Sequence, residues 1–93
     1  MTKVIMHISD DGSIMFDCVN HAGKKDVCIM CSTLVNVLIT ACRRENIQPT
    51  VDEDGHLRLD IEKAGPELIS TFRAVRDVFY EVEDQFPFFC KNY

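Results

Sequence analysis

The sequence has little positive charge and no clustered basic stripe. Lysine and arginine number 10 against 15 aspartate and glutamate residues, so the formal net charge is −5. Because a protein that binds a phosphate backbone needs several clustered cations, we expect no direct nucleic-acid partner. An acidic surface favours basic partners, although it also serves solubility.

The sequence also lacks the apolar runs of exported and membrane-spanning proteins. Its first residues, MTKVIMHISDDG, hold no run long enough for a signal peptide, and no stretch approaches the roughly 20 apolar residues of a transmembrane helix. We therefore expect a cytoplasmic protein without a membrane partner. In that reducing compartment, five cysteines favour buried small residues, a metal site or a reactive thiol over disulfides.

Length and composition predict one domain spanning residues 1–93. Hydrophobic residues make up 46% and charged residues 27% of the chain, which excludes a disordered or low-complexity protein. A chain of this size buries roughly 60 to 65% of its unfolded surface when it folds alone, less than a larger domain does, so its stability is marginal. We therefore expect a homodimer that covers an exposed apolar face.

Two turn signals, Asp10-Asp11-Gly12 and Glu53-Asp54-Gly55, predict two β-hairpins. The expected strands cover residues 3–8, 13–19, 50–52 and 56–61. A last segment, residues 88–93, has strand-like composition and could form an edge strand, a loose arm or a dimer contact.

Apolar residues at three- and four-residue spacings predict two helices. The first runs from Val27 to about Glu45 with Asp26 as its N-cap, and its wide apolar surface indicates a central, largely buried helix. The second opens at Gly65-Pro66-Glu67 and ends before Pro87. The order β-β-α-β-β-α-(β) predicts an α+β fold with a mostly antiparallel sheet covered by two helices.

Cys28 and His21 form the strongest candidate for chemistry. Cys28 lies near the expected helix start, where unpaired N–H groups and the helix dipole favour a thiolate. The loop between the two residues allows the imidazole to reach the sulfur, as a nucleophile and its base require. The N–H groups of Cys28 and Ile29 could donate to the oxyanion of a tetrahedral intermediate.

The same stretch allows two other interpretations. Cys28 and Cys31 form a C-x-x-C run that could bind zinc with His21 and Cys18, or act as a redox pair. A zinc site is disfavoured because the sequence has no second pair of closely spaced zinc ligands. A redox pair is disfavoured because no thioredoxin-like βαβ pattern surrounds the C-x-x-C run.

These residues resemble the Prp family of ribosomal-processing cysteine proteases. The family pattern is Gly-His-Ala, a variable loop, then Cys followed four residues later by Ser at the start of an apolar helix. The matching stretch here is Asn20-His21-Ala22, residues 23–27 and Cys28-Ile29-Met30-Cys31-Ser32. The resemblance continues through an acidic-Gly turn, the strand Leu57-Arg58-Leu59 and the helix end Gln85-Phe86-Pro87.

The resemblance implies a homodimeric α+β endopeptidase that removes a short N-terminal extension from large-subunit ribosomal protein 27 before ribosome assembly. It implies Cys28 as the nucleophile, His21 as the general base and acid, and Ser32 as a support of the local geometry. It implies no metal and no cofactor. Asp17 and Asp26 are candidates to orient His21, with ordinary turn and cap roles favoured for both.

The sequence departs from the family pattern in three places. Asn20 replaces glycine, and asparagine is the next most tolerant residue of a positive φ angle. The loop before Cys28 is short and lacks a glycine-rich insert that would form a flap over the cleft. Ile29 and Met30 stand where small residues are usual. The alternative is therefore a non-catalytic ribosome-assembly or interaction module, with a zinc-binding module third.

Overall fold

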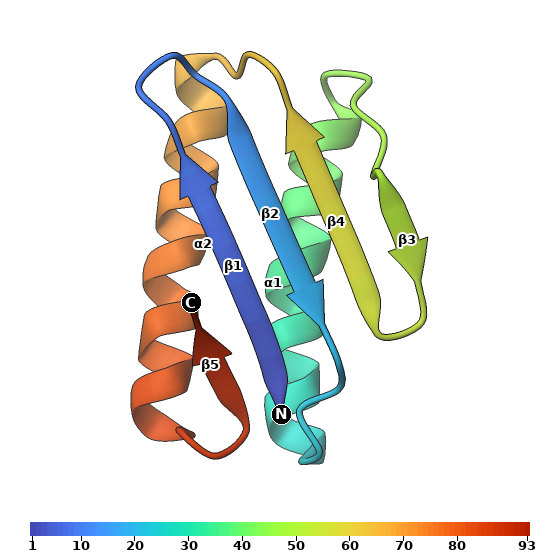
Figure 1. Ribbon diagram of the computed structural model, residues 1–93, viewed down its shortest axis with the longest axis vertical. Helices are drawn as coiled ribbons and strands as arrows, with labels where there is room; N and C mark the ends of the chain where they lie inside the picture. The colour runs from blue at the N-terminus through green and yellow to red at the C-terminus, as the bar shows by residue number, and fades with distance from the viewer.

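Two hairpins and a C-terminal strand build one five-stranded sheet, as the computed structural model of residues 1–93 shows (Figure 1). In chain order the elements are β1 (Thr2–Ile8), β2 (Ile14–Val19), α1 (Lys25–Arg43), β3 (Val51–Glu53), β4 (His56–Ile61), α2 (Pro66–Gln85) and β5 (Cys90–Asn92). The strands lie side by side in the order β3-β4-β2-β1-β5. The predicted α+β class and element order are confirmed.

Strand pairing is antiparallel everywhere except at β5. β1 pairs with β2, β2 with β4 and β4 with β3, all antiparallel. The last segment forms an edge strand parallel to β1, with Cys90 opposite Thr2. Of the three expectations for residues 88–93, the edge strand is therefore the one observed.

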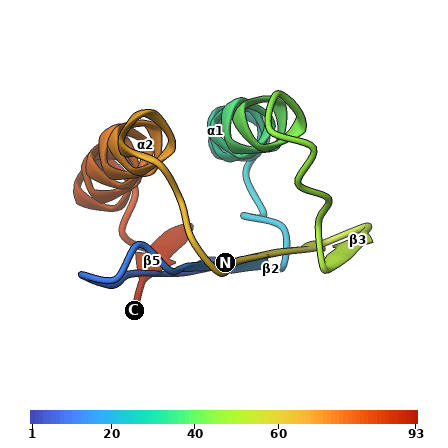
Figure 2. The same cartoon turned by 90° about the horizontal axis from the view of Figure 1, so that it is seen from above.

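Both helices cover the same face of the sheet, and the other face has no covering layer (Figure 2). Alternate strand residues such as Phe16 and Leu59 point into the core and are fully buried. The rings of Phe72 and Phe79 from α2 pack against Phe16, with centroids 6.5 and 6.0 Å away. This aromatic cluster fixes α2 on the sheet, and it confirms the predicted apolar stripe of that helix.

Helix α1 differs from the prediction at both ends. It begins at Lys25 instead of Val27 and ends at Arg43, two residues before the expected end. Lys24, not Asp26, is the N-cap, and no side chain caps the helix. Asp26 lies in the first turn, where its negative charge interacts favourably with the positive end of the helix dipole, although its side chain does not cap the helix.

The expectation that α1 is largely buried is wrong. Only Val27, Cys31, Leu38 and Cys42 of its 19 residues are buried, while Ile29 and Val37 are 56% and 43% exposed. The physical reason is that α1 shares its layer with α2 alone, so its outer side meets no other element (Figure 2).

Helix α1 is also long and apolar enough to cross a membrane, with a mean hydropathy of 1.5. This finding corrects the expectation that no stretch approaches such a span. The core helix of a soluble protein passes the same test by length and composition, and here α1 packs against the sheet and α2.

The C-terminal strand is fastened to α2 by Glu83. One carboxylate oxygen accepts hydrogen bonds from the backbone N–H and the side-chain amide of Asn92, at 2.8 and 2.9 Å. The other oxygen lies 3.3 Å from the ammonium group of Lys91. The hydrogen bonds from Asn92, and then the charge of Lys91, hold the pKa of Glu83 below its usual value.

We predict that Glu83→Ala loosens β5 and lowers stability by about 1–2 kcal/mol, because the Asn92 N–H loses a charged acceptor. Since the pKa of Glu83 is depressed in the folded state, its contribution is present above about pH 4.5 and is lost as the pH falls through the folded-state pKa. Urea denaturation of the two proteins should therefore converge at low pH. Glu81→Ala, which changes an exposed residue of the same helix, is the control; equal midpoints for all three proteins at pH 7 would contradict the prediction.

Candidate active site

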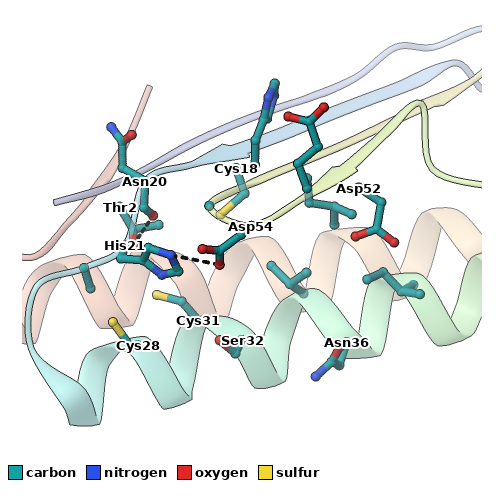
Figure 3. Close-up of a pocket in the computed structure, with 17 residues that line it drawn as sticks. Thr2, Cys18, Asn20, His21, Cys28, Cys31, Ser32, Asn36, Asp52 and Asp54 are labelled. Carbon is teal, nitrogen blue, oxygen red and sulfur yellow. Dashed lines mark hydrogen bonds and ion pairs between the residues drawn. The ribbon is translucent and has the colours of Figure 1, made fainter.

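A groove of about 330 Å³ lies between α1 and the β3–β4 hairpin (Figure 3). Its floor includes the apolar side chains of Val35, Ile39 and Leu57. Polar and reactive residues line the rest: Thr2, Cys18, Asn20, His21, Cys28, Cys31, Ser32, Asn36, Asp52, Asp54 and their neighbours. No lysine or arginine lines this groove.

His21 reaches the groove because the chain turns sharply after β2. Asn20 has a φ angle of 69°, so the left-handed backbone expected at this position is confirmed. Its N–H donates to the carbonyl oxygen of Gly55 at 2.7 Å, and its own carbonyl oxygen accepts a hydrogen bond from the Thr2 hydroxyl at 3.1 Å. These bonds join the turn to β1 and to the tip of the β3–β4 hairpin, and His21 follows directly.

Cys28 lies in the first turns of α1, half-buried, with its sulfur at the same end of the groove as the imidazole of His21 (Figure 3). Because the helix begins at Lys25, Cys28 is its fourth residue rather than its first or second. The positive end of the helix dipole is still close to the thiol, and its effect falls off within the first turn.

The early helix start changes which N–H groups are free. The N–H of Cys28 donates to the carbonyl oxygen of Lys24 at 2.9 Å, so the expectation that it is an open oxyanion donor is wrong. Ile29 lies further into the helix, where backbone N–H groups bond within the helix, and its exposed side chain does not line the groove. The N–H groups without intrahelical partners are those of residues 25–27.

Ser32 lies one helical turn beyond Cys28 and lines the same groove (Figure 3). Residues four apart occupy the same face of a helix, as the sequence predicted for this pair. The structure thus brings together His21, Cys28 and Ser32, and it leaves Ile29 outside.

The five cysteines, all of them free, have different environments. Burial raises the pKa of Cys18 to about 12 and that of Cys42 to about 11, which disfavours the thiolate form of both near neutral pH. The hydrogen bond between Cys31 and Cys90 raises the pKa of Cys90 and lowers that of Cys31. Cys42 is fully buried in the core, whereas Cys18 is half-buried and lines the groove.

His21 contacts an acidic residue that the sequence analysis did not select. Its Nε2 lies 3.2 Å from a carboxylate oxygen of Asp54, at the tip of the β3–β4 hairpin. Asp17, one of the two predicted candidates, instead contacts Nε2 of His56 at 2.7 Å. Asp26 makes no contact with His21. The acidic-Gly turn predicts a hairpin, but nothing in the local sequence indicates that this hairpin folds over His21.

The structure gives no support to a zinc site at His21, Cys28 and Cys31. No group of three or more histidine, cysteine, aspartate or glutamate side chains is arranged to hold a metal ion. A zinc site needs three or four such ligands at one point.

An α+β domain with a thiol and an imidazole in one open groove has the parts needed for nucleophilic attack on a carbonyl carbon. The same fold is found in the crystal structure of an essential ribosomal processing protease, Prp from S. aureus, in complex with a covalently linked product peptide. The TM-score is 0.80 at 18% sequence identity, and the match covers 100% of this chain and 99% of that chain. No family model and no curated protein matches the sequence. This chain therefore has the fold of Prp.

We predict that Asn20→Gly keeps the fold whereas Asn20→Val destabilises it by about 1–2 kcal/mol, because a β-branched residue resists the left-handed backbone. Thermal unfolding of both variants measures the difference. Ser9→Val serves as a control for the added apolar side chain in another exposed loop. Equal stability of Asn20→Val and Asn20→Gly would show that this turn does not require a positive φ angle.

Proposed function

We propose that this chain is a cytoplasmic cysteine endopeptidase that removes the N-terminal extension of large-subunit ribosomal protein 27. The observation that supports it most directly is the placement of His21 and Cys28 at one end of a groove, in a fold shared with a ribosomal processing protease. The groove is open to solvent, so a peptide has access to both residues.

The reaction begins with proton transfer from the Cys28 thiol to the His21 imidazole. The thiolate attacks the carbonyl carbon of the scissile bond, and the imidazolium gives its proton to the leaving amine as the C–N bond breaks. A thioester to Cys28 remains. His21 then takes a proton from water, the resulting hydroxide attacks the thioester, and the C–S bond breaks. The imidazolium returns its proton to Cys28, and the peptide acid loses its own proton to solvent and leaves as a carboxylate.

The charge of the groove supports a basic protein substrate. Asp52 and Asp54 lie along the hairpin side of the groove, and the groove has no lysine or arginine to offset them. A ribosomal protein, which is rich in basic residues because it binds RNA, has the complementary charge. The apolar floor at Val35 and Ile39 offers contact to apolar side chains of the extension.

We predict that the wild-type protein shortens an N-terminally extended ribosomal protein 27, as measured by intact mass. Cys28→Ala should abolish cleavage because the nucleophile is lost, and His21→Ala should lower kcat/KM by about 10²-fold or more because the base is lost. Cys42→Ala, which removes a fully buried thiol on the same helix, should cleave normally.

An unchanged mass with wild-type protein, on a soluble and extended substrate, would contradict the proposal and favour a non-catalytic interaction module of the same fold. Cleavage that persists in Cys28→Ala would assign the nucleophile elsewhere. Measuring thermal unfolding of each variant separates lost chemistry from lost folding.

We also propose that the protein is a homodimer, with the outer side of α1 as the contact. Ile29, Thr33 and Val37 follow one another at four-residue spacing, so they share one face of the helix. Ile29 and Val37 are large exposed apolar residues that no other element of the chain covers. A second copy would bury both and remove the apolar surface from water.

We predict a solution mass of twice the 10.6 kDa of one chain, measured by light scattering after size exclusion. Val37→Glu should shift the protein to the monomer because it places a charge in the contact. His7→Glu, which adds the same residue on the uncovered face of the sheet, should leave the dimer intact. A monomeric wild-type protein, or a dimer that tolerates Val37→Glu, would exclude this contact.

A further inference from the structure

The contact between His21 and Asp54 carries an inference about the catalytic apparatus. We propose that Asp54 is a positioning residue, which orients the His21 imidazole toward Cys28 and stabilises its protonated form. This inference rests on the proposed cysteine-protease function. The two groups come from distant parts of the chain, and their atoms lie 3.2 Å apart (Figure 3).

The backbone keeps the carboxylate beside the ring. Gly55, directly after Asp54, has a φ angle of 78°, which folds the hairpin tip back toward His21. A Cβ atom at Gly55 would lie 3.6 Å from the Nε2 atom of His21. The carbonyl oxygen of Gly55 also accepts the N–H of Asn20, at 2.7 Å. The hairpin tip and the segment that carries His21 are thus joined by a backbone bond next to the side-chain contact.

The contact assigns a role to each ring nitrogen. Nε2–H donates to the Asp54 carboxylate, so Nδ1 is the unprotonated nitrogen that accepts the thiol proton. Once His21 is protonated, the carboxylate faces the imidazolium charge, as the acidic member of a catalytic triad does. The other titratable groups of the groove are Cys18, Cys28, Cys31, Asp52, Glu53 and His56.

Other acidic residues are not placed for this role. Asp17 is held by His56 at 2.7 Å and by Arg58 at 3.8 Å. Because His56 pairs with Asp17, Asp54 is the acidic residue left to contact His21.

The solvent exposure of His21 and Asp54 determines how strongly the two side chains attract each other. The side chains of His21 and Asp54 are 67% and 95% exposed, so water screens their attraction in the free protein. A peptide lying in the groove covers both and excludes water, which strengthens the attraction as the imidazolium forms. The effect of Asp54 should therefore fall on kcat rather than on KM.

The experiment compares Asp54→Asn and Asp54→Ala with wild type. We expect Asp54→Asn to lower kcat by about tenfold with KM within about twofold, and Asp54→Ala to lower kcat at least as much. The rate of Cys28 alkylation by a peptidyl chloromethyl ketone, which covers the groove as a peptide substrate does, should fall below pH 7 in both variants and equal the wild-type rate at high pH, where the thiolate forms without an imidazolium. ¹⁵N NMR of His21 should show the loss of the Nε2–H tautomer.

Asp10→Asn makes the same chemical change at the tip of the β1–β2 hairpin and should leave every readout unchanged. If His21→Ala slows alkylation and cleavage but Asp54→Asn changes neither, Asp54 has no positioning role and the proposed function stands. If His21→Ala itself leaves alkylation and cleavage unchanged, the proposed function fails first. A loss of kcat in Asp54→Asn with an unaltered pH profile and tautomer would indicate a merely structural role and overturn the inference.

Discussion

The groove depends on the left-handed backbone at Asn20. Between β2 and α1 the chain must leave the plane of the sheet and enter the helix layer, and the φ angle of 69° makes that change within one residue. The N–H of Asn20 bonds to Gly55 and its carbonyl oxygen to Thr2, so the turn is held from both sides. His21 therefore emerges over the groove, beside the start of α1. An extended conformation at Asn20 would continue β2 and carry the imidazole away from Cys28.

The C-terminal segment supports the turn at Asn20, although none of its residues lines the groove. The N–H of Thr2 donates to the carbonyl oxygen of Phe89 at 2.9 Å, which aligns the residue whose hydroxyl holds Asn20. The ammonium group of Lys24, just before α1, lies 5.4 and 5.6 Å from the ring centroids of Phe86 and Phe89. The segment after α2 thus contacts Lys24 of the loop directly and supports Asn20 through Thr2. The contacts of Glu83 with β5 therefore stabilise the turn beside the groove as well as the edge of the sheet.

Periodicity predicted the elements well because it reports which side of each strand or helix is buried. The alternation of Leu57, Leu59 and Ile61 and the α2 stripe around Phe72 and Phe79 are both observed in the core. Composition predicted the burial of α1 poorly, since apolar residues do not reveal how many neighbours a helix has. The sequence does not indicate that α1 begins as early as Lys25, because no side chain caps the helix there. The local spacing of His21 and Cys28 is enough to predict that they lie together. Asp54 lies far away in the sequence and comes close to His21 only because the β3–β4 hairpin folds beside it.

The exposure of the site follows from the short loop between His21 and Cys28. No flap separates the imidazole or Asp54 from water, so the protein alone does not supply a low-dielectric site. In the proposed protease the bound peptide would supply it, because covering the groove removes water from the imidazole and the carboxylate together. Substrate binding and activation of the nucleophile are then coupled through the same surface. Such a thiol, half-buried in the free protein and fully reactive only under a bound peptide, would be protected from reaction with other electrophiles.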